Sequence, residues 1–224
     1  MERSTVDMRT IIFAGGTLRP GMAVDKAIAT AEQIIAADSG AETALRFGLI
    51  PHFIVGDFDS LSLPLEDFRE PGSEIIQVAA EKDETDTELA IAVAIERGAS
   101  DITILGALGG ERFDHTMANV LLLAGFASPP IRIVDGPSVS WLLRGPGSTT
   151  IDGQPDDLLS LLPLTAEARG VRTTNLYYPL HGKTLHFGKP RGVSNVLTQS
   201  QAEVSLERGL LLIIHTAVSE LQHS

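Results

Sequence analysis

A series of short apolar runs in the first 135 residues restricts the possible folds of this chain more than any other feature. Most residues of these runs are apolar, without the alternation of a half-exposed strand. Such strands are typical of a parallel sheet that is covered on both faces. Most of the first five runs are followed by a turn signal and a helical stretch, which is the order of an α/β fold. The predicted strands are Ile11–Ala14, Ile34–Ala37, Phe53–Val55, Glu74–Val78, Ile102–Leu105 and Ile131–Val134.

The clearest helix is predicted over Thr85–Arg97. Thr85 and Glu88 have the spacing of a capping box at its start, and Gly98 is a stop signal at its end. Its apolar face is predicted to consist of Leu89, Ala90, Val93 and Ala94.

The chain after Asp135 has no helical spacing. Short apolar segments separated by Gly, Pro and Asn turns predict an antiparallel sandwich or barrel. We therefore expect an α/β domain over 1–135 and a β domain over 136–224, with the boundary near Ile131–Pro137. The strands predicted in the second domain are Trp141–Leu143, Leu158–Leu162, Thr184–Phe187, Ala202–Leu206 and Leu210–His215.

The charge of the chain limits its partners. Seventeen basic and 29 acidic residues give a formal net charge of −12, which repels nucleic acid and anionic membranes. An anionic substrate would need metal ions to bridge it to the protein. The chain has no cysteine, no apolar run near the ~20 residues of a membrane span, and no signal-peptide core within Met1–Thr10. We expect a soluble protein located in the cytoplasm.

Carboxylates follow several of the predicted strands. Asp38 follows the second strand, Asp57 and Asp59 follow the third, and Asp83 and Asp86 follow the fourth. Each could be a plain turn or helix-start residue. Their convergence at the ends of consecutive strands instead indicates a ligand site.

Mg²⁺ is the cation that such a cluster would suit. Asp57 and Asp59 are two residues apart, so in an extended segment both side chains point the same way. Carboxylates held together repel one another unless a cation lies between them. Hard oxygen ligands favour Mg²⁺, which can complete its shell with substrate phosphates.

A glycine-rich turn after the fifth strand is a second candidate anion site. Glycines allow backbone amides to approach an anion, and a helix is expected from about His115. Arg112 could bind phosphate with its two-pronged guanidinium group. Asp114 could orient Arg112, join the metal ligands, or simply cap the helix. The segment is Gly106-Ala107-Leu108-Gly109-Gly110-Glu111-Arg112-Phe113-Asp114-His115.

At these residues the chain resembles the thiamine pyrophosphokinase family. The motifs run in family order over nearly the whole chain, with Ser39 where the family usually has Gly and Glu111 as an extra residue before Arg112. They are Ala37-Asp38-Ser39-Gly40-Ala41, Gly56-Asp57-Phe58-Asp59-Ser60, Lys82-Asp83-Glu84-Thr85-Asp86, Gly109-Gly110-Glu111-Arg112-Phe113-Asp114-His115, Leu176-Tyr177-Tyr178-Pro179-Leu180 and Gly192-Val193-Ser194-Asn195.

The resemblance implies a Rossmann-like parallel-sheet α/β domain that binds nucleotide and metal, followed by an antiparallel β-sandwich that binds thiamine and forms the dimer. It implies a homodimer with active sites between subunits. The reaction would transfer the pyrophosphoryl group of ATP to the hydroxyl of thiamine with Mg²⁺, giving AMP and thiamine diphosphate.

The resemblance also implies roles for individual residues. Asp57, Asp59 and Asp86 would be metal and catalytic carboxylates, with Arg112 and Asp114 in supporting catalytic positions. The expected nucleotide, phosphate and thiamine contacts are Asp38, Ser39, Asp83, Thr85, Gly109, Gly110, Tyr178, Ser194 and Asn195.

The same residues are compatible with two other functions. The same carboxylates would serve a Mg²⁺-dependent phosphohydrolase that uses water as the acceptor, and a nucleotide or thiamine sensor would need no catalysis. Tyr178 also has a structural alternative, because Tyr177 and Tyr178 fall on a predicted strand where both could pack the sheet.

Overall fold

The computed structural model describes residues 7–69 and 72–221. The chain divides into two compact units, Met1–Gly136 and Pro137–Ser224, and each is described by itself. The expectation that Met1–Thr10 contains no signal-peptide core falls mostly on residues 1–6, which lie outside the described residues. No helix in the described parts of the chain is long and apolar enough to span a membrane.

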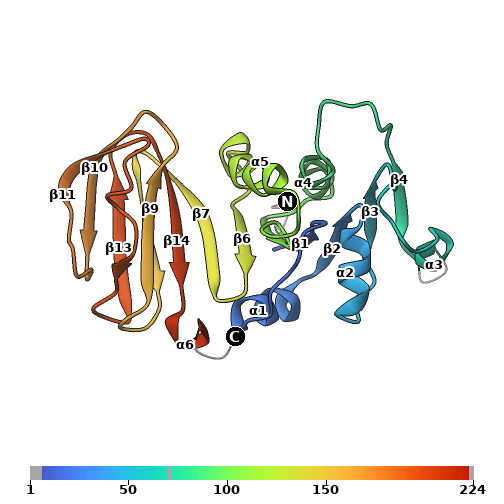
Figure 1. The fold of residues 1–224 in the computed structure, drawn as a ribbon, viewed down its shortest axis with the longest axis horizontal. Coiled ribbons are helices and arrows are strands. Elements are labelled where there is room, and N and C mark those ends of the chain that lie inside the picture. Colours follow the sequence, from blue (N-terminus) through green and yellow to red (C-terminus); the bar gives the residue numbers. More distant parts are fainter. Residues whose placement is uncertain (1–6, 70–71, 222–224) are drawn as a thin grey trace, which may run out of the picture. The chain divides into compact units, whose positions relative to one another are not determined.

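The N-terminal unit contains a parallel sheet (Figure 1). Its strand order is β6-β5-β1-β2-β3-β4, and every neighbouring pair within it is parallel. All six strands coincide with the predicted apolar runs to within two residues at each end. Their bounds are β1 Arg9–Phe13, β2 Gln33–Ala37, β3 Phe53–Gly56, β4 Glu74–Gln77, β5 Asp101–Leu105 and β6 Ile131–Asp135.

Helices cover both faces of this sheet. In Figure 1, α4 and α5 lie side by side above it, and α1 and α2 lie below. The fully buried side chains of Ile12, Ile35, Ile54 and Ile104 confirm that the central strands are covered on both faces. The edge strand β4 differs, because its residues are only partly buried or exposed. The helices are α1 Met22–Thr30, α2 Gly40–Arg46, α3 Glu66–Arg69, α4 Asp86–Glu96 and α5 Phe113–Gly125.

The predicted start and end of α4 are confirmed, but its predicted buried face is partly wrong. Thr85 Oγ1 accepts a hydrogen bond from Glu88 N at 3.2 Å, and Gly98 follows the helix with a φ of +90°. Leu89 and Val93 are only half-buried, because the helix turns a different side toward the sheet. The buried residues are Thr87, Ala90, Ile91 and Ala94.

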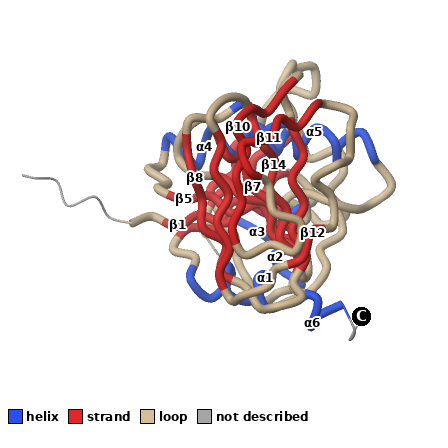
Figure 2. Tube along the Cα trace, turned by 90° about the vertical axis from the view of Figure 1, so that its left-hand side faces the viewer, coloured by secondary structure: helices blue, strands red, loops and turns tan. Residues whose placement is uncertain are grey.

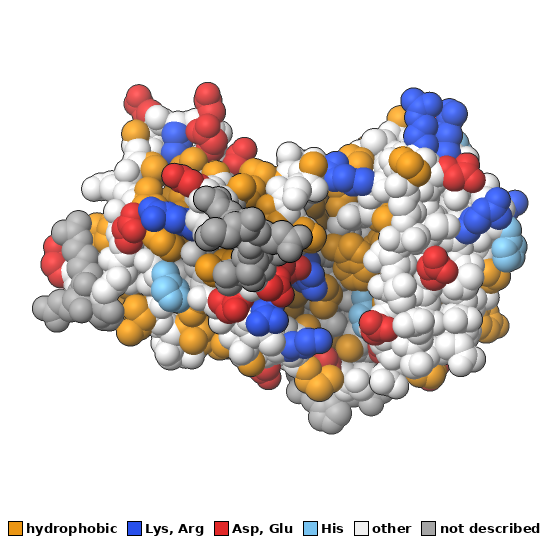
Figure 3. All heavy atoms as spheres, turned by 180° about the vertical axis from the view of Figure 1, so that it is seen from behind, with side chains coloured by type: hydrophobic (Ala, Val, Ile, Leu, Met, Phe, Trp, Pro, Cys, Tyr) orange, Lys and Arg blue, Asp and Glu red, His pale blue; other side chains and the backbone are white. Residues whose placement is uncertain are grey.

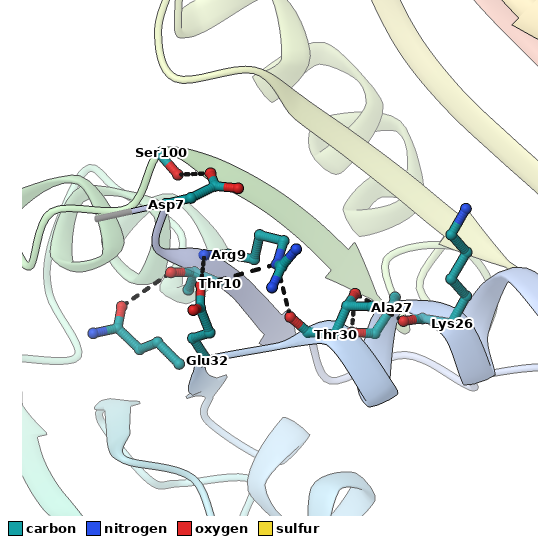
Figure 4. Close-up of polar contacts among 9 residues, drawn as sticks. Asp7, Arg9, Thr10, Lys26, Ala27, Thr30, Glu32 and Ser100 are labelled. Carbon is teal, nitrogen blue, oxygen red and sulfur yellow. Dashed lines mark hydrogen bonds and ion pairs between the residues drawn. The ribbon is translucent and has the colours of Figure 1, made fainter. Parts of the chain in front are cut away.

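Polar contacts fix the start of β1 to neighbouring segments (Figure 4). Arg9 donates from Nε to the carbonyl of Thr30 at 2.9 Å, which joins the strand to the end of α1. The backbone N–H of Arg9 donates to Glu32, and the Thr10 hydroxyl donates to Gln33 in β2. These contacts hold the two central strands in register at the edge opposite the predicted site.

The C-terminal unit contains two antiparallel sheets, with orders β12-β9-β14-β7 and β11-β10-β13-β8. Figure 2 turns the molecule so that these strands face the viewer. Buried residues of both sheets form one apolar core, including Leu161 and Ile213 from one and Val171 and Val204 from the other. The predicted fold class, a parallel α/β domain followed by an antiparallel β-sandwich, is confirmed. The elements are β7 Ser138–Arg144, β8 Gly147–Asp152, β9 Leu158–Pro163, β10 Glu167–Thr174, β11 His181–His186, β12 Asn195–Val196, β13 Gln201–Leu206, β14 Leu210–Thr216 and α6 Val218–Leu221.

Three strands of this unit, β8, β10 and β12, were not predicted. In β8 only Ile151 is fully buried, and the other positions are glycine or polar. The sequence of β10 contains Gly170 and charged residues, and its pairing with β11 shifts register between Ala168 and Val171. A hydrophobic pattern cannot reveal such strands, because pairing with adjacent strands defines their position in the sheet and their own side chains carry little apolar signal.

Candidate active site

The reversal of strand order between β1 and β5 positions a pocket in the N-terminal unit. From β1 the chain proceeds to β2, β3 and β4, and β5 then returns to pair on the other side of β1. In open α/β sheets the carboxyl ends of the strands at such a reversal form a ligand crevice. A cavity of about 550 Å³ lies there, lined by Gly15, Gly16, Ala37, Asp38, Ser39, Asp57, Asp59, Ser60, Ala80, Lys82, Asp83, Glu84, Thr85, Asp86, Thr87, Gly106, Ala107, Gly109, Gly110, Glu111, Arg112, His115, Thr116 and Asn119.

Two glycine segments approach each other at the pocket. Gly16 N donates to Gly106 O at 2.9 Å, and a Cβ added to Gly16 would lie 2.5 Å from that same oxygen. Gly106 itself has a φ of +67°, where an added Cβ would meet Ala14 O at 2.8 Å. Only glycine permits this contact between the loops after β1 and β5.

Helix α5 holds the second glycine loop in place. The buried Asn119 donates from Nδ2 to the carbonyl of Ala107 at 3.0 Å, and Gly109 N donates to Thr116 Oγ1 at 3.3 Å. Gly109 and Gly110 have φ values of +102° and +90°. The loop is therefore fixed before any ligand binds.

The loop after β3 brings Asp57 and Asp59 to the pocket by a turn, not by an extended segment. Phe58 has a φ of +68°, and Asp59 N donates to Asp57 Oδ1 at 3.2 Å. The expectation of an extended segment is therefore wrong. Asp57 is a turn residue, which was the alternative to a role as a ligand. Its second carboxylate oxygen, Oδ2, still faces a neighbouring cation.

That cation is Lys82, which lies between two carboxylates. Its Nζ is 3.0 Å from Asp86 Oδ1 and 3.7 Å from Asp57 Oδ2. Burial alone would lower the pKa of Lys82, but its close contact with Asp86 and the negative charges of Asp86, Asp57 and Asp38 outweigh burial and raise that pKa. Lys82 is therefore charged at neutral pH.

Asp38 is the most deeply buried carboxylate of the pocket. It is 8% exposed, its φ is +47°, and its Oδ1 has no hydrogen-bond partner in the structure. Burial raises the pKa of Asp38, and the negative charges of Asp86 and Asp57 raise it further, against a backbone hydrogen bond from Ser39 that lowers it. A carboxylate in such a place costs stability when it is ionised.

Replacing Asp38 by Asn should therefore stabilise the metal-free protein. A raised pKa in the folded state means that stability falls as pH rises from the unfolded pKa through the folded one, and the loss is complete above it. Asp38→Asn should raise the melting temperature at pH 7 by roughly 2–4 °C while activity falls. Melting curves between pH 3 and pH 8 should show the advantage of the variant disappearing at low pH. A variant less stable than the parent at pH 7 would contradict this account.

The donor set fits a divalent cation such as Mg²⁺. Asp38 Oδ1 and Asp86 Oδ1 are buried without a hydrogen-bond partner, although Asp86 Oδ1 is within ion-pair distance of Lys82. Among the described residues no group of three or more His, Asp or Glu is already arranged to hold a metal. In this arrangement Lys82 balances the carboxylates.

Arg112 and Asp114 form an exposed ion pair at the start of α5. Arg112 donates from Nε to Asp114 Oδ1 at 3.0 Å and from its terminal nitrogen to Oδ2 at 2.6 Å. This contact lowers the pKa of Asp114 to about 2. Arg112, not Asp114, occupies the N-cap position, because the helix begins at Phe113, so the helix-cap interpretation of Asp114 is wrong. Asp114 orients the Arg112 guanidinium beside the pocket.

The remaining predicted residues of this unit also line the cavity. They include Ser39, Asp83 and Thr85, and Glu111, the extra residue before Arg112, lines the cavity as well. Ser39 has φ −60° and ψ −9°, so its backbone does not require the glycine usual in the family. A Cβ added to Gly15 would meet the Ser39 hydroxyl at 2.7 Å, which places this hydroxyl at the first glycine loop.

Three predicted residues form a separate group in the C-terminal unit. The buried Asn195 accepts from Tyr178 N at 3.0 Å and donates to Tyr178 O at 2.8 Å, so it holds the backbone of Tyr178. Tyr178 is 65% exposed and follows β10 outside any strand, so the predicted strand and the sheet-packing interpretation are both wrong. The rings of Tyr177 and Tyr178 meet edge-on, with their centroids 4.8 Å apart. Ser194 is exposed with a φ of +57°, and its N–H donates to Ser160.

Sequence analysis missed several residues of the pocket. The pair Gly15-Gly16 directly after the first strand is a signal that could have been read, since consecutive glycines there permit a close backbone approach. Lys82 was quoted within a motif but given no role. No sequence pattern indicates Asn119, whose contact with Ala107 depends on the packing of α5. The missed residues that line the pocket include Gly15, Gly16, Ser60, Lys82, Thr116 and Asn119.

Family models match both units of the chain. Residues 24–134 match the catalytic domain of thiamin pyrophosphokinase, and residues 148–211 match its vitamin B1 binding domain.

Individual relatives agree with these models. Thiamine pyrophosphokinase of Bacillus subtilis is 31% identical over 186 residues, which cover 81% of this chain and 86% of the relative. A crystal structure of the B. subtilis protein has a TM-score of 0.81 at 29% identity and covers 93% of this chain and 98% of its own. The thiamin pyrophosphokinase structure from Geobacillus thermodenitrificans has a TM-score of 0.76 at 32% identity, with coverage of 93% and 97%. The fold, the pocket and the motifs that line it agree with these matches, and the chain belongs to the thiamine pyrophosphokinase family.

Proposed function

We propose that this protein transfers the pyrophosphoryl group of ATP to the hydroxyl of thiamine, producing thiamine diphosphate and AMP. The observation that carries the proposal is the pocket at the strand-order reversal of a chain from this family. Its lining combines glycine loops, which suit phosphates, with a cluster of carboxylates, which suits a divalent cation.

Three carboxylates of the pocket are proposed to hold Mg²⁺, namely Asp57, Asp59 and Asp86. Mg²⁺ bound there would neutralise negative charge on the phosphate oxygens of ATP. Asp38 adds a buried carboxylate beside them, and the backbone amides of Gly109 and Gly110 would contact the phosphates.

The residues of the chain have the remaining tasks of orientation and proton transfer. Arg112, oriented by Asp114, is proposed to contact the polyphosphate with the part of its guanidinium that Asp114 leaves open. The attacking hydroxyl must lose a proton, and Asp59 and Asp86 are the two candidate bases. Asp83, Ser39 and Thr85 support the nucleotide site from the pocket wall.

The C-terminal unit is proposed to bind thiamine and to form the dimer. Thiamine is a cation, and the exposed ring of Tyr178 offers it an aromatic face. Asn195 would act by holding the Tyr178 backbone, and Ser194 presents an exposed hydroxyl nearby in the sequence.

Product analysis tests the proposed function directly. Purified protein with ATP, thiamine and Mg²⁺ should give AMP and thiamine diphosphate in equal amounts. ADP or free phosphate without thiamine diphosphate would favour the phosphohydrolase. Binding without any product would favour the sensor.

The thiamine pocket can be tested at Tyr178. Tyr178→Ala should raise the thiamine KM several-fold to roughly thirty-fold, since an aromatic contact with a cation is worth ~1–2 kcal/mol. The ATP KM should change much less. Phe187→Ala, which removes an equally exposed ring of the same unit, should leave both constants near the parent values. An unchanged thiamine KM in a stable Tyr178→Ala protein would exclude Tyr178 from the pocket.

We also propose that the protein is a homodimer. The family resemblance implies active sites between subunits, and exposed apolar residues of the C-terminal unit, including Tyr177 and Val193, would be covered in such an assembly. Sedimentation at micromolar concentration should give a single species of twice the 23.9 kDa chain mass. A fully active monomer would contradict the shared site.

Because the reaction consumes ATP, we propose a cytoplasmic location, which cell fractionation can check.

A further inference from the structure

Lys82 lines the pocket with a positive charge, which has the same sign as the charge of the proposed metal ion. Its ammonium contacts Asp86 at 3.0 Å and Asp57 at 3.7 Å, and its side chain is only 14% exposed. Both contacted residues belong to the carboxylates proposed to hold Mg²⁺. An ammonium and a metal ion therefore compete for the same oxygen atoms.

The charge of the surroundings explains why a cation is needed there. The N-terminal unit carries 10 of the 17 basic and 22 of the 29 acidic residues, and the C-terminal unit carries 7 of each. The entire net charge of −12 thus belongs to the N-terminal unit, and on the face in Figure 3 acidic side chains are spread over this unit. The pocket has seven acidic lining residues, with Lys82 and Arg112 as its basic ones. The Arg112 guanidinium is paired with Asp114.

Helix stabilisation does not account for this ion pair. Lys82 and Asp86 are four residues apart, but Lys82 precedes α4, which begins at Asp86. A cation at the N-terminus of a helix is unfavourable, because the helix dipole is positive there. An Asp86 side chain without Lys82 beside it would interact more favourably with the positive end of the helix dipole. The position of Lys82 is instead explained by the carboxylates that it separates.

We propose that Lys82 is an internal counter-cation, which neutralises the carboxylates of the metal-free pocket and must leave Asp57 and Asp86 before a divalent cation binds them. The flexible four-carbon stem of lysine allows this movement without a change in the backbone. The pocket can then stay assembled between turnovers, at the cost of weaker metal binding. Lys82 is in this account a positioning residue for the carboxylates.

Metal binding without substrates tests the proposal. Mn²⁺ alone can be titrated into the metal-free full-length protein and followed by calorimetry or by its electron paramagnetic resonance. Lys82→Met should bind Mn²⁺ at least ~tenfold more tightly than the parent, because a neighbouring positive charge is gone. Lys82→Arg keeps the charge and should bind Mn²⁺ no more tightly than the parent.

The control variant is Lys26→Met, which removes the same charge from the same unit. Lys26 is exposed on α1, its ammonium has no contact among those drawn in Figure 4, and it does not line the pocket. Its Mn²⁺ affinity should stay within about threefold of the parent, which measures the effect of net charge alone.

Thermal stability gives a second readout. Metal-free Lys82→Met should melt below the parent, because its carboxylates repel one another, and saturating Mn²⁺ should raise its melting temperature more than that of the parent. If the metal-free variant does not fold, Mn²⁺ should restore folding. Unchanged or weaker Mn²⁺ binding by Lys82→Met, or a stability loss that Mn²⁺ does not repair, would overturn the proposal. The inference rests on the proposed metal site, and because no substrate is present, failure of the transferase assay would not affect this result.

Discussion

Asp57→Asn should lower the turnover number at least ~100-fold while the protein remains folded. Asn retains an oxygen that can accept the 3.2 Å hydrogen bond from Asp59 N, so the turn after β3 persists. What disappears is the negative charge that faces Lys82 at 3.7 Å and that is proposed to bind Mg²⁺. Steady-state kinetics at saturating ATP, thiamine and Mg²⁺, together with a melting curve, would measure both effects.

The matched control for this prediction is Asp25→Asn. Asp25 is an exposed residue in the first turn of α1, outside the pocket, so its variant should keep nearly full activity. The affinity of Asp57→Asn for Mn²⁺ should also fall. Near-normal turnover in a well-folded Asp57→Asn protein would remove Asp57 from the proposed metal ligands.

Gly40→Ala should destabilise the N-terminal unit by about 3 kcal/mol. A Cβ at Gly40 would lie 2.0 Å from Phe13 O and 2.6 Å from the carbonyl carbon of the same residue. Phe13 is fully buried in β1, which pairs with β2 and β5 and cannot move aside. The melting temperature of this unit should fall by roughly 6–12 °C in calorimetry.

Gly125→Ala serves as the comparison for Gly40→Ala. Gly125 ends α5 with nothing within 4 Å of an added Cβ, so the same change there should be neutral or slightly stabilising. Gly40→Ala should also lower activity, because Gly40 begins α2 directly after the pocket residues Asp38 and Ser39. A Gly40→Ala protein as stable as the parent would show that α2 can shift away from β1.

The fold class could be predicted from the sequence because two patterns are local. The buried strands of the N-terminal unit are continuously apolar, and Ile12, Ile54 and Ile104 are fully buried as that pattern requires. Turn residues and short apolar segments likewise indicated most strands of the β-sandwich. Strands β8 and β10 escaped prediction because few of their own residues carry a hydrophobic signal.

The candidate site was predicted in composition but not in arrangement. The order of strands explains why carboxylates from separate loops converge, and the sequence predicts this convergence once a parallel sheet is assumed. The turn at Phe58, with its φ of +68°, and the exposure of Tyr178 depend on backbone conformation that no spacing rule revealed.

The types of chemical group present, and the strand ends that carry them, follow from the sequence, because hydrophobic patterning and motif order are properties of neighbouring residues. The tertiary structure alone decided which charges face one another. Lys82 lies between Asp57 and Asp86 because the turn after β3 and the start of α4 meet at one edge of the sheet. Asp38 lies beside Gly56 where β2 and β3 pair, and its Oδ1 is buried there without a hydrogen-bond partner. Such contacts join residues far apart in the chain, and their energies depend on burial and distance, which only the folded chain defines.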